Sequence, residues 1–249
     1  MLHLISLGLG DEKDITLRGL EALQKCDIVY IESYTSVLQC TKQTLEEAYG
    51  KKMHVATREI VETKAEQLLL EPAKTKDVAL LVIGDAVTAT THVDLMMRAK
   101  QLGIAVQVIH NASVVSAVGI TGLQVYKFGK ITSIPFENDN VETPYGVLET
   151  NKEAGLHTLF LLDLDPIESK FLTIADAIRY LLRLELKKGK GLFKESTLCV
   201  ACARLGADIR IVSGTAKKLL EADMGKPPYC LIVPGKLHFM EEEALNAAK

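Results

Sequence analysis

Short apolar runs alternate with stretches of helical periodicity through the first half of the chain. The runs end at Gly, Asp or Asn, or give way to a helical stretch, and they cover residues 2–7, 27–31, 53–56, 78–83 and 105–109. Residues 78–83 are apolar at nearly every position, which predicts a strand buried on both faces. Between the runs, apolar residues recur at helical spacing, as at Leu17, Leu20 and Leu23. Alternating strands and helices are typical of βαβ units, so the pattern predicts a largely parallel sheet.

The second half predicts a different, mixed sheet. Its apolar runs are residues 158–162, 197–203, 209–212 and 230–233, and the hairpin-like spacing of 203–212 indicates antiparallel pairs. Thr173 and Asp176 stand in capping-box spacing before an apolar helical stripe, and Thr91 and Asp94 have the same spacing. Residues 113–123 are apolar around the whole helical wheel, which predicts a buried helix at the junction. We therefore expect two α/β domains, residues 1–111 and 112–249.

Composition and charge limit the classes of partner. The 249 residues are 48% hydrophobic and 24% charged, as in globular domains. Lys and Arg number 29 against 32 Asp and Glu, a net charge of -3, so we expect no nucleic-acid partner. No apolar run approaches the roughly 18 residues of a membrane span, and no basic stretch precedes the first strand. A cytoplasmic protein without a membrane span is the expectation.

Metal ligands and nucleophiles form no recognisable motif. The five cysteines are too sparse for a disulfide scaffold. Cys199 and Cys202 lie three apart in a predicted strand, where their side chains point to opposite faces. The six histidines show no H-E-x-x-H or other close ligand spacing, so we expect no catalytic metal. The lack of a G-x-S-x-G elbow argues against a serine nucleophile.

The turns that follow the strands are the places to look for a ligand site. In open α/β sheets, ligands bind beyond the carboxyl ends of the strands. For any one of these turns taken alone, a tight turn that needs glycine or proline is a more common explanation than a ligand site. The turns are Gly8-Leu9-Gly10, Gly84-Asp85, Asn111-Ala112-Ser113, Asp163, Arg204-Leu205-Gly206 and Pro227-Pro228-Tyr229.

Two kinds of chemistry remain open on the residues alone. The turn Gly8-Leu9-Gly10 follows a strand, and Glu32 lies near the end of the next one, as in an NAD-dependent oxidoreductase. However, Lys13 stands where the dinucleotide fingerprint has its third glycine. The other interpretation is methyl transfer from a sulfonium, an in-line displacement in which positioning alone contributes up to ~7 to 11 kcal/mol.

Several longer stretches resemble one known family. They are residues 5–10 with Asp14-Ile15-Thr16, Gly84-Asp85 with residues 89–92, residues 116–123 with 126–129, His157-Thr158-Leu159, and residues 227–238. These stretches span nearly the whole chain. On them the chain resembles the diphthine synthases, members of the tetrapyrrole-methylase-like class of methyltransferases.

The resemblance implies both a fold and a reaction. It implies an N-terminal, mostly parallel Rossmann-like sheet and a C-terminal mixed α/β sheet, with S-adenosyl-L-methionine in the cleft between the domains. It implies a homodimer that methylates the 3-amino-3-carboxypropyl group on a modified histidine of translation elongation factor 2, at the amine and in some members also at a carboxylate. The alternatives are a methylase of the same fold acting on another substrate, such as a tetrapyrrole, and more distantly an NAD-dependent oxidoreductase or a non-enzymatic binding module.

The resemblance also assigns cofactor contacts residue by residue. Asp85 is expected to hold a polar or cationic part of the cofactor, and backbone groups near Ser113 to receive its carboxylate. Two positions depart from the family, which usually has proline at Ala86 and commonly histidine at Tyr229. No residue is assigned as a catalytic acid or base. The expected contacts are Leu9, Asp85, Thr88, Ser113, Val114, Leu162, Leu205 and Tyr229.

Overall fold

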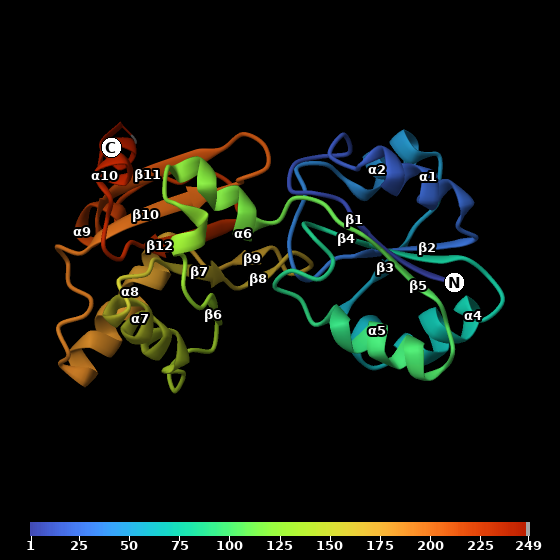
Figure 1. The fold of residues 1–249 in the computed structure, drawn as a ribbon, viewed down its shortest axis with the longest axis horizontal. Helices are drawn as coiled ribbons and strands as arrows, with labels where there is room; N and C mark the ends of the chain where they lie inside the picture. The colour runs from blue at the N-terminus through green and yellow to red at the C-terminus, as the bar shows by residue number, and fades with distance from the viewer. Residues whose placement is uncertain (248–249) are drawn as a thin grey trace. The chain divides into compact units, whose positions relative to one another are not determined.

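The chain folds into two compact units, drawn as a ribbon in Figure 1. The computed structural model describes residues 1–247. The first unit comprises Met1–Val115 and the second begins at Ser116, so the exact boundary expected after residue 111 stays a prediction. Within residues 1–247, no helix is long and apolar enough to cross a membrane.

A parallel sheet organises the first unit. The strand order is β3-β2-β4-β1-β5, and each neighbouring pair is parallel, as the alternating pattern predicts. Because the strands run in the same direction, the loops that follow them gather at one edge of the sheet. The strands are β1 (Leu2–Ser6), β2 (Ile28–Glu32), β3 (His54–Ala56), β4 (Val78–Val82) and β5 (Val106–Ile109).

Both faces of this sheet are buried. Leu80 and Val82 of β4 pack in one apolar cluster, while Ala79 and Leu81 pack in a second cluster on the other face. Alternate strand residues point to opposite faces, so an all-apolar strand needs a helical layer on each side. Helices α1 and α2 supply one layer, and α3, α4 and α5 the other (Figure 1). The helices are α1 (Leu17–Lys25), α2 (Lys42–Tyr49), α3 (Arg58–Glu62), α4 (Glu71–Ala73) and α5 (His92–Gln101), with a π-helical turn at Glu66–Leu70.

The second unit has the predicted mixed sheet. Its strand order is β11-β10-β12-β7-β6, in which β6 and β7 are parallel and the other pairs are antiparallel. A separate pair, β8 with β9, forms a short hairpin. The strands are β6 (Thr132–Ile134), β7 (Thr158–Leu162), β8 (Leu164–Asp165), β9 (Lys170–Phe171), β10 (Leu198–Ala203), β11 (Arg210–Thr215) and β12 (Tyr229–Val233).

Helices cover both faces of the second sheet as well. Tyr145, Ile178 and Ala216, from three helices, pack in one cluster with Phe160 of β7. On the other face the Ser213 hydroxyl donates to the carbonyl of Leu245 at 2.6 Å, which joins β11 to the last helix. The helices are α7 (Thr143–Glu153), α8 (Ile174–Lys188), α9 (Ala216–Leu219) and α10 (Phe239–Ala247), and α6 (Val114–Ala117) spans the boundary between the two units.

The predicted junction helix is wrong in length and burial. Only Val114–Ala117 is α-helical, and Val118–Thr121 continues as a 3-10 turn. Gly122 ends the segment in the left-handed region, with φ of 85°, which glycine adopts without strain. Ile120, expected to be buried, is 58% exposed. The apolar pattern therefore marks a bent segment that presents part of its surface to solvent.

Candidate functional site

Two glycines join the ends of the central strands β1 and β4. Gly8 N donates to Gly84 O at 3.1 Å, and Gly84 N donates to Gly8 O at 2.7 Å. Their φ angles are 79° and 80°, a region that favours glycine. A Cβ atom at Gly8 would also come within 2.8 Å of the Asp14 Cβ. The first two turns found in the sequence therefore form one structure, and the predicted contact residue Leu9 lies against Gly84.

Asp14 fixes the loop that follows β1. One carboxylate oxygen accepts hydrogen bonds from Leu9 N at 3.2 Å and from Gly10 N at 2.7 Å. The Asn111 amide donates to Asp14 O at 2.9 Å and thereby ties this loop to the one after β5. A dinucleotide pyrophosphate would need these same backbone donors. Because an anionic side chain already holds them, the loop does not favour the dinucleotide hypothesis.

Asp85 is buried and joins two loops. Its Oδ1 atom accepts from Val87 N at 3.1 Å and from the Thr88 hydroxyl at 3.0 Å. Its Oδ2 atom accepts from His110 Nδ1 at 2.9 Å and from Asn111 N at 3.2 Å. Burial alone would raise the pKa of Asp85, but these four hydrogen bonds outweigh it and lower the pKa. Asp85 is thus an ionised carboxylate that orders the loops after β4 and β5.

Both the backbone N–H and the backbone carbonyl of Ala86 are hydrogen-bonded. Ala86 N donates to the Ser6 hydroxyl at 2.9 Å. Ala86 O accepts from the Thr90 hydroxyl at 2.8 Å and lies 3.0 Å from His92 Nδ1. A proline has no N–H to donate. The alanine at this position therefore makes a hydrogen bond to the end of β1 that a proline could not make.

His92 connects this loop to a buried acid on β2. Its Nε2 atom lies 3.5 Å from Glu32 Oε2 and 3.5 Å from the Tyr34 hydroxyl. The Glu32 side chain is 1% exposed, and its Oε2 atom has no hydrogen-bond partner within residues 1–247. Burial raises the pKa of Glu32 to about 7, against smaller lowering effects from Thr35 and Arg58. An acid buried in this way does not suit a ribose contact, which is further evidence against a dinucleotide enzyme.

The loop after β5 contains the next two expected contacts. Ser113 is buried, and α6 begins directly after it at Val114. Asn111 precedes them and its side chain accepts from Ala112 N at 2.7 Å. The first unit thus brings the loops of Leu9, Asp85 and Thr88 together with the turn at residues 111–113.

In the second unit, three further expected contacts meet at one edge of the sheet. Tyr229 pairs with Ala203 across β12 and β10, and Cys230 pairs with Leu161 across β12 and β7. Leu162 therefore ends β7 beside the start of β12. Leu205 follows the end of β10 at the same edge.

Arg204 organises these loops, and the sequence did not single out its side chain. It is 6% exposed and has a φ of 50°, in the left-handed region. Its Nε donates to Asp208 O at 3.1 Å, its Nη1 donates to Lys226 O, and its backbone N donates to Pro228 O at 3.0 Å. One guanidinium therefore joins the loop that carries Leu205 to the segment before Tyr229. In the sequence, a single arginine after a predicted strand does not indicate that its side chain orders two loops.

The cysteine pair is structural, as expected. Cys199 and Cys202 are both buried in β10, and Cys199 packs in the cluster on one face while Cys202 pairs with Cys230 across the sheet. Burial raises the pKa of Cys199, and a hydrogen bond with Cys230, followed by burial, raises that of Cys202. Thiols held in their neutral form are poor nucleophiles and poor metal ligands.

In each unit, the charged side chains at the strand ends make contacts within that unit. Within residues 1–247, no group of three or more His, Cys, Asp or Glu side chains is placed to hold a metal ion. The charged groups Asp14, Asp85 and Arg204 are engaged in ordering loops. Such an arrangement favours a reaction that depends on orienting two reactants.

Comparison with known proteins identifies the family. The family model of the tetrapyrrole (corrin/porphyrin) methylases matches residues 1–220. A diphthine synthase of Methanocaldococcus jannaschii is 49% identical over 99% of this chain and 98% of its own length. A probable diphthine methyl ester synthase of Arabidopsis thaliana is 46% identical over 100% of this chain and 98% of its own length.

A solved structure supports the same assignment. The structure of a putative diphthine synthase from Entamoeba histolytica matches with a TM-score of 0.91 and 44% identity, over 100% of this chain and 98% of that one. Both the expected α/β fold and the expected methyltransferase class are confirmed. The chain belongs to the tetrapyrrole methylase family and, within it, to the diphthine synthases.

Proposed function

We propose that this chain transfers methyl groups from S-adenosyl-L-methionine to the 3-amino-3-carboxypropyl group on the modified histidine of translation elongation factor 2. The main support is the sequence identity of 46% to 49%, over nearly all of the chain, to a diphthine synthase and a probable diphthine methyl ester synthase. The strand-end loops of the first unit support it, because Asp14 and Asp85 hold them in fixed conformations where the strands of a parallel sheet end, the place at which open α/β sheets bind ligands. A tetrapyrrole methylase remains the second candidate, since the family model takes its name from that class.

The cofactor contacts belong to this proposal. We expect S-adenosyl-L-methionine, and its product S-adenosyl-L-homocysteine, to contact residues of both units. Asp85 acts by fixing the backbone around it, since both of its oxygens already accept hydrogen bonds from the protein. The leucines pack on the apolar surfaces of the cofactor. The residues are Leu9, Asp85, Thr88, Ser113 and Val114 of the first unit, and Leu162, Leu205 and Tyr229 of the second.

The reaction needs little acid or base chemistry from the protein. S-adenosyl-L-methionine, held by the expected contacts, would supply the methyl group of its sulfonium to the substrate amine and would leave as the neutral thioether S-adenosyl-L-homocysteine. Each further methylation requires that the amine first lose a proton, which solvent accepts. The protein contributes by holding the two reactants in line and by excluding competing water.

Two measurements test the proposed function. Calorimetry should show binding of S-adenosyl-L-homocysteine and none of NAD; the reverse result would exclude a methyltransferase. Mass spectrometry of elongation factor 2 incubated with the chain and labelled S-adenosyl-L-methionine should then show methyl groups on the modified histidine. If the cofactor binds but the factor gains no methyl group, a methylase of the same fold acting on another substrate becomes the better candidate.

A homodimer in the cytoplasm completes the proposal. Exposed apolar side chains on two segments, which a hydrogen bond from Gln124 N to Glu241 joins, support the dimer, because exposed apolar surface is often covered by another protein surface. The exposed fractions are 58% for Ile120, 41% for Val125, 81% for Tyr126, 67% for Phe239 and 55% for Met240. Light scattering should give twice the mass of the chain, and Tyr126→Asp should shift the equilibrium towards the monomer. A monomeric parent chain would refute the dimer. The cytoplasm is where elongation factor 2 acts.

A further inference from the structure

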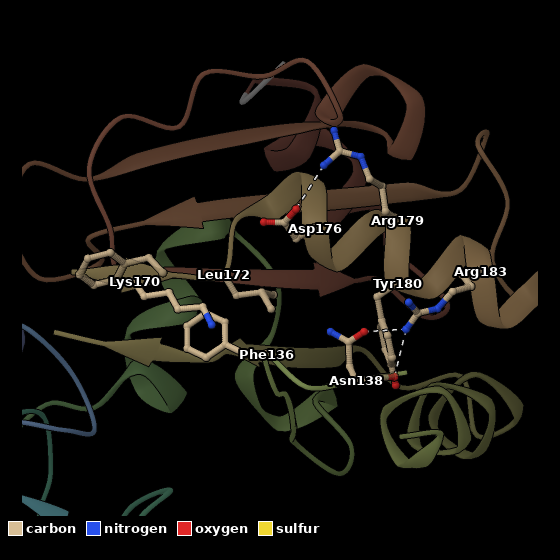
Figure 2. Close-up of a pocket in the computed structure, with 9 residues that line it drawn as sticks. Phe136, Asn138, Lys170, Leu172, Asp176, Arg179, Tyr180 and Arg183 are labelled. Atoms are coloured by element: carbon tan, nitrogen blue, oxygen red, sulfur yellow. Dashed lines mark hydrogen bonds and ion pairs between the residues drawn. The ribbon is translucent and has the colours of Figure 1, made fainter. Parts of the chain in front are cut away.

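A groove in the second unit lies outside the expected cofactor contacts. It has a volume of about 440 Å³ and runs between the end of β6, the hairpin strand β9 and one side of α8 (Figure 2). Pockets of this size accommodate a small ligand or a few side chains of a peptide. Its walls combine three cations and three rings with one carboxylate, that of Asp176. The lining residues are Phe136, Asn138, Lys170, Phe171, Leu172, Asp176, Arg179, Tyr180 and Arg183.

Lys170 is a cation without an acidic partner at the mouth of this groove. Its Nζ atom lies 4.2 Å from the centre of the Phe136 ring, and in Figure 2 the two side chains point towards each other. Within residues 1–247, the ion pairs closer than 4.0 Å include no partner for Lys170. A cation over an aromatic face keeps its charge and remains able to bind an anion.

Arg179 adds a second available cation on α8. Its side chain is 64% exposed, and one of its amino groups lies 3.2 Å from Asp176. That carboxylate is also engaged in the capping box of α8, where its Oδ2 accepts from Thr173 N and from the Thr173 hydroxyl. Among the described residues, no other hydrogen bond engages the guanidinium of Arg179, so its remaining donors can bind a carboxylate in a planar, bidentate manner.

Arg183 stabilises one wall of the groove, and its two amino groups are already hydrogen-bonded to the protein. Its two amino groups bind Asp139 Oδ1 at 3.0 Å, Asn138 O at 3.0 Å and Asn138 Oδ1 at 2.6 Å. The guanidinium also lies 5.7 Å from the centre of the Tyr180 ring. These contacts fix the segment after β6 against α8, so the groove is held open by its own side chains.

The groove is rigidly connected to the end of β7. Phe136 N donates to Asp163 Oδ2 at 3.2 Å, and Leu172 N donates to Asp163 O at 2.9 Å. Asp163 directly follows Leu162, which is one of the expected cofactor contacts. A group bound in the groove is therefore held at a fixed place relative to that strand end.

From this arrangement we propose that the groove docks a carboxylate-bearing segment of the protein substrate, outside the modified histidine itself. The proposal rests on the proposed function. Charge complementarity supports it, because Lys170 and Arg179 offer positive charge at one hollow of a chain whose net charge is -3. The aromatic walls favour a peptide, whose side chains bury apolar surface beside the charged contacts. Such a site would set the affinity for the protein substrate without touching the reacting atoms.

Charge reversal at Lys170 provides the test. We expect Lys170→Glu to weaken binding of elongation factor 2, measured by calorimetry with S-adenosyl-L-homocysteine present, by about tenfold at low salt. The loss should shrink at high salt, where exposed charges are screened. Arg179→Gln should weaken binding in the same direction. The Kd for S-adenosyl-L-homocysteine should stay at the parent value in both variants.

The matched control is Lys217→Glu, which reverses an exposed lysine of α9 that is 75% exposed and lies 3.5 Å from Glu195. If it weakens binding as much as Lys170→Glu, overall charge explains the effect and the groove has no specific role. Unchanged binding in Lys170→Glu and Arg179→Gln would also overturn the proposal, while a parent chain that fails to methylate the factor at all would instead refute the proposed function. Competition by a short RNA but not by a glutamate-rich octapeptide would show that the site takes phosphates and not a peptide.

Discussion

Each unit buries one histidine beside one glutamate, yet the two pairs are built in opposite ways. In the first unit His92 lies beside Glu32, and in the second His157 lies beside Glu241. All four side chains are 0% or 1% exposed. The two pairs are equally hidden from solvent, but Glu32 lies more deeply in the protein than Glu241, and the hydrogen-bond donors around the two carboxylates also differ.

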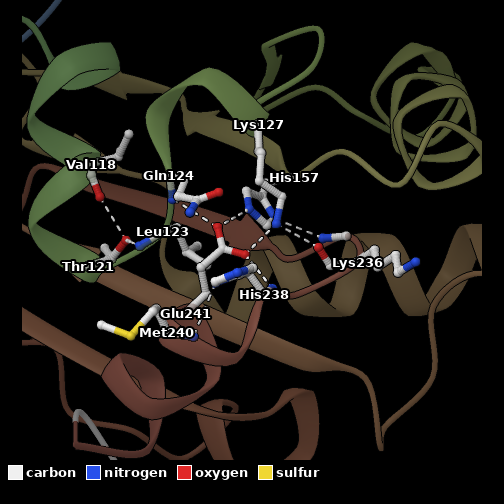
Figure 3. Close-up of polar contacts among 11 residues, drawn as sticks. Val118, Thr121, Leu123, Gln124, Lys127, His157, Lys236, His238, Met240 and Glu241 are labelled. Atoms are coloured by element: carbon white, nitrogen blue, oxygen red, sulfur yellow. Dashed lines mark hydrogen bonds and ion pairs between the residues drawn. The ribbon is translucent and has the colours of Figure 1, made fainter.

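Glu241 is surrounded by donors. Oε1 accepts from Gln124 N at 2.9 Å and lies 3.0 Å from His157 Nε2, while Oε2 accepts from His238 N at 2.8 Å and from the Lys127 ammonium (Figure 3). Burial alone would raise the pKa of Glu241, but the donors, Lys127 first among them, lower it to about 2. The carboxylate joins α10 to the segment at residues 124–127 and to the start of β7. It works as an ionised structural centre.

Glu32 has few donors. Oε1 accepts from Thr35 N at 3.0 Å, and Oε2 has no partner within residues 1–247. Burial therefore dominates and raises the pKa to about 7. The groups that face the pair are Tyr34, Arg58 and Glu62, and Arg58 is the only cation among those that affect Glu32.

The histidines differ in the ring nitrogen that carries the proton. Gly235 N donates to His157 Nδ1 at 3.0 Å, so the proton of the neutral ring is on Nε2 and is donated to Glu241. His92 Nδ1 faces Ala86 O, so its proton is on Nδ1 and the lone pair of Nε2 faces Glu32. A protonated Glu32 can donate to that lone pair, whereas an ionised one cannot. The His92 ring is therefore compatible with a neutral Glu32, and the His157 ring with an ionised Glu241.

The largest expected effect comes from removing the charge of Glu241. Glu241→Gln removes the buried anion that pairs with the partly exposed ammonium of Lys127, so we expect the free energy of unfolding to fall by about 3 kcal/mol at pH 8, measured by urea denaturation. Because the folded pKa lies below the unfolded one, this stability is lost as pH falls from about 4.5 to about 2. Glu243→Gln, an exposed position on the same helix, is the control. A loss equal to that of the control would mean that the network does not stabilise the fold.

The same substitution at Glu32 should have the opposite sign. The folded pKa of about 7 lies above the unfolded value, so stability from this group is present below pH 4.5 and is lost as pH rises to about 7. Glu32→Gln removes that penalty, and we expect it to stabilise the chain by about 1 to 3 kcal/mol at pH 8 and by much less at pH 5. Thermal or urea unfolding at the two pH values measures this. Destabilisation at both values would show that Glu32 is ionised and paired in the folded chain.

A third experiment asks whether the first unit has a carboxylate equivalent to Glu241. Asp85 is the candidate, since it accepts four hydrogen bonds and its pKa is lowered. We expect Asp85→Ala to weaken binding of S-adenosyl-L-homocysteine by about tenfold or more, an order of 1.4 kcal/mol. Calorimetry and circular dichroism together would separate lost binding from lost folding. A folded variant with the affinity of the parent would remove Asp85 from the site.

The contrast between the pairs also shows what the sequence can predict. Alternation of apolar runs and helical stretches is a local property, and it gave both sheets and the strand ends at Gly8, Gly84 and Leu162. The contacts of Asp14, Arg204 and Glu241 link residues far apart in the chain or depend on loop conformations. The spacing of residues along the chain therefore could not predict these contacts. The cofactor contacts came from resemblance to a family, not from periodicity.

The smallest effect separates two threonines that the sequence cannot distinguish. Thr173 and Asp176 form a complete capping box, but Thr91 makes no side-chain bond at the start of α5, where Asp94 pairs with Arg98 at 2.9 Å. Thr173→Ala should therefore cost about 1 kcal/mol of unfolding free energy, and Thr91→Ala less than about 0.5 kcal/mol. Urea denaturation of both variants at one pH measures the difference. Equal losses would mean that Thr91 does cap α5, and that the loop before His92 is held as tightly as the helix start in the second unit.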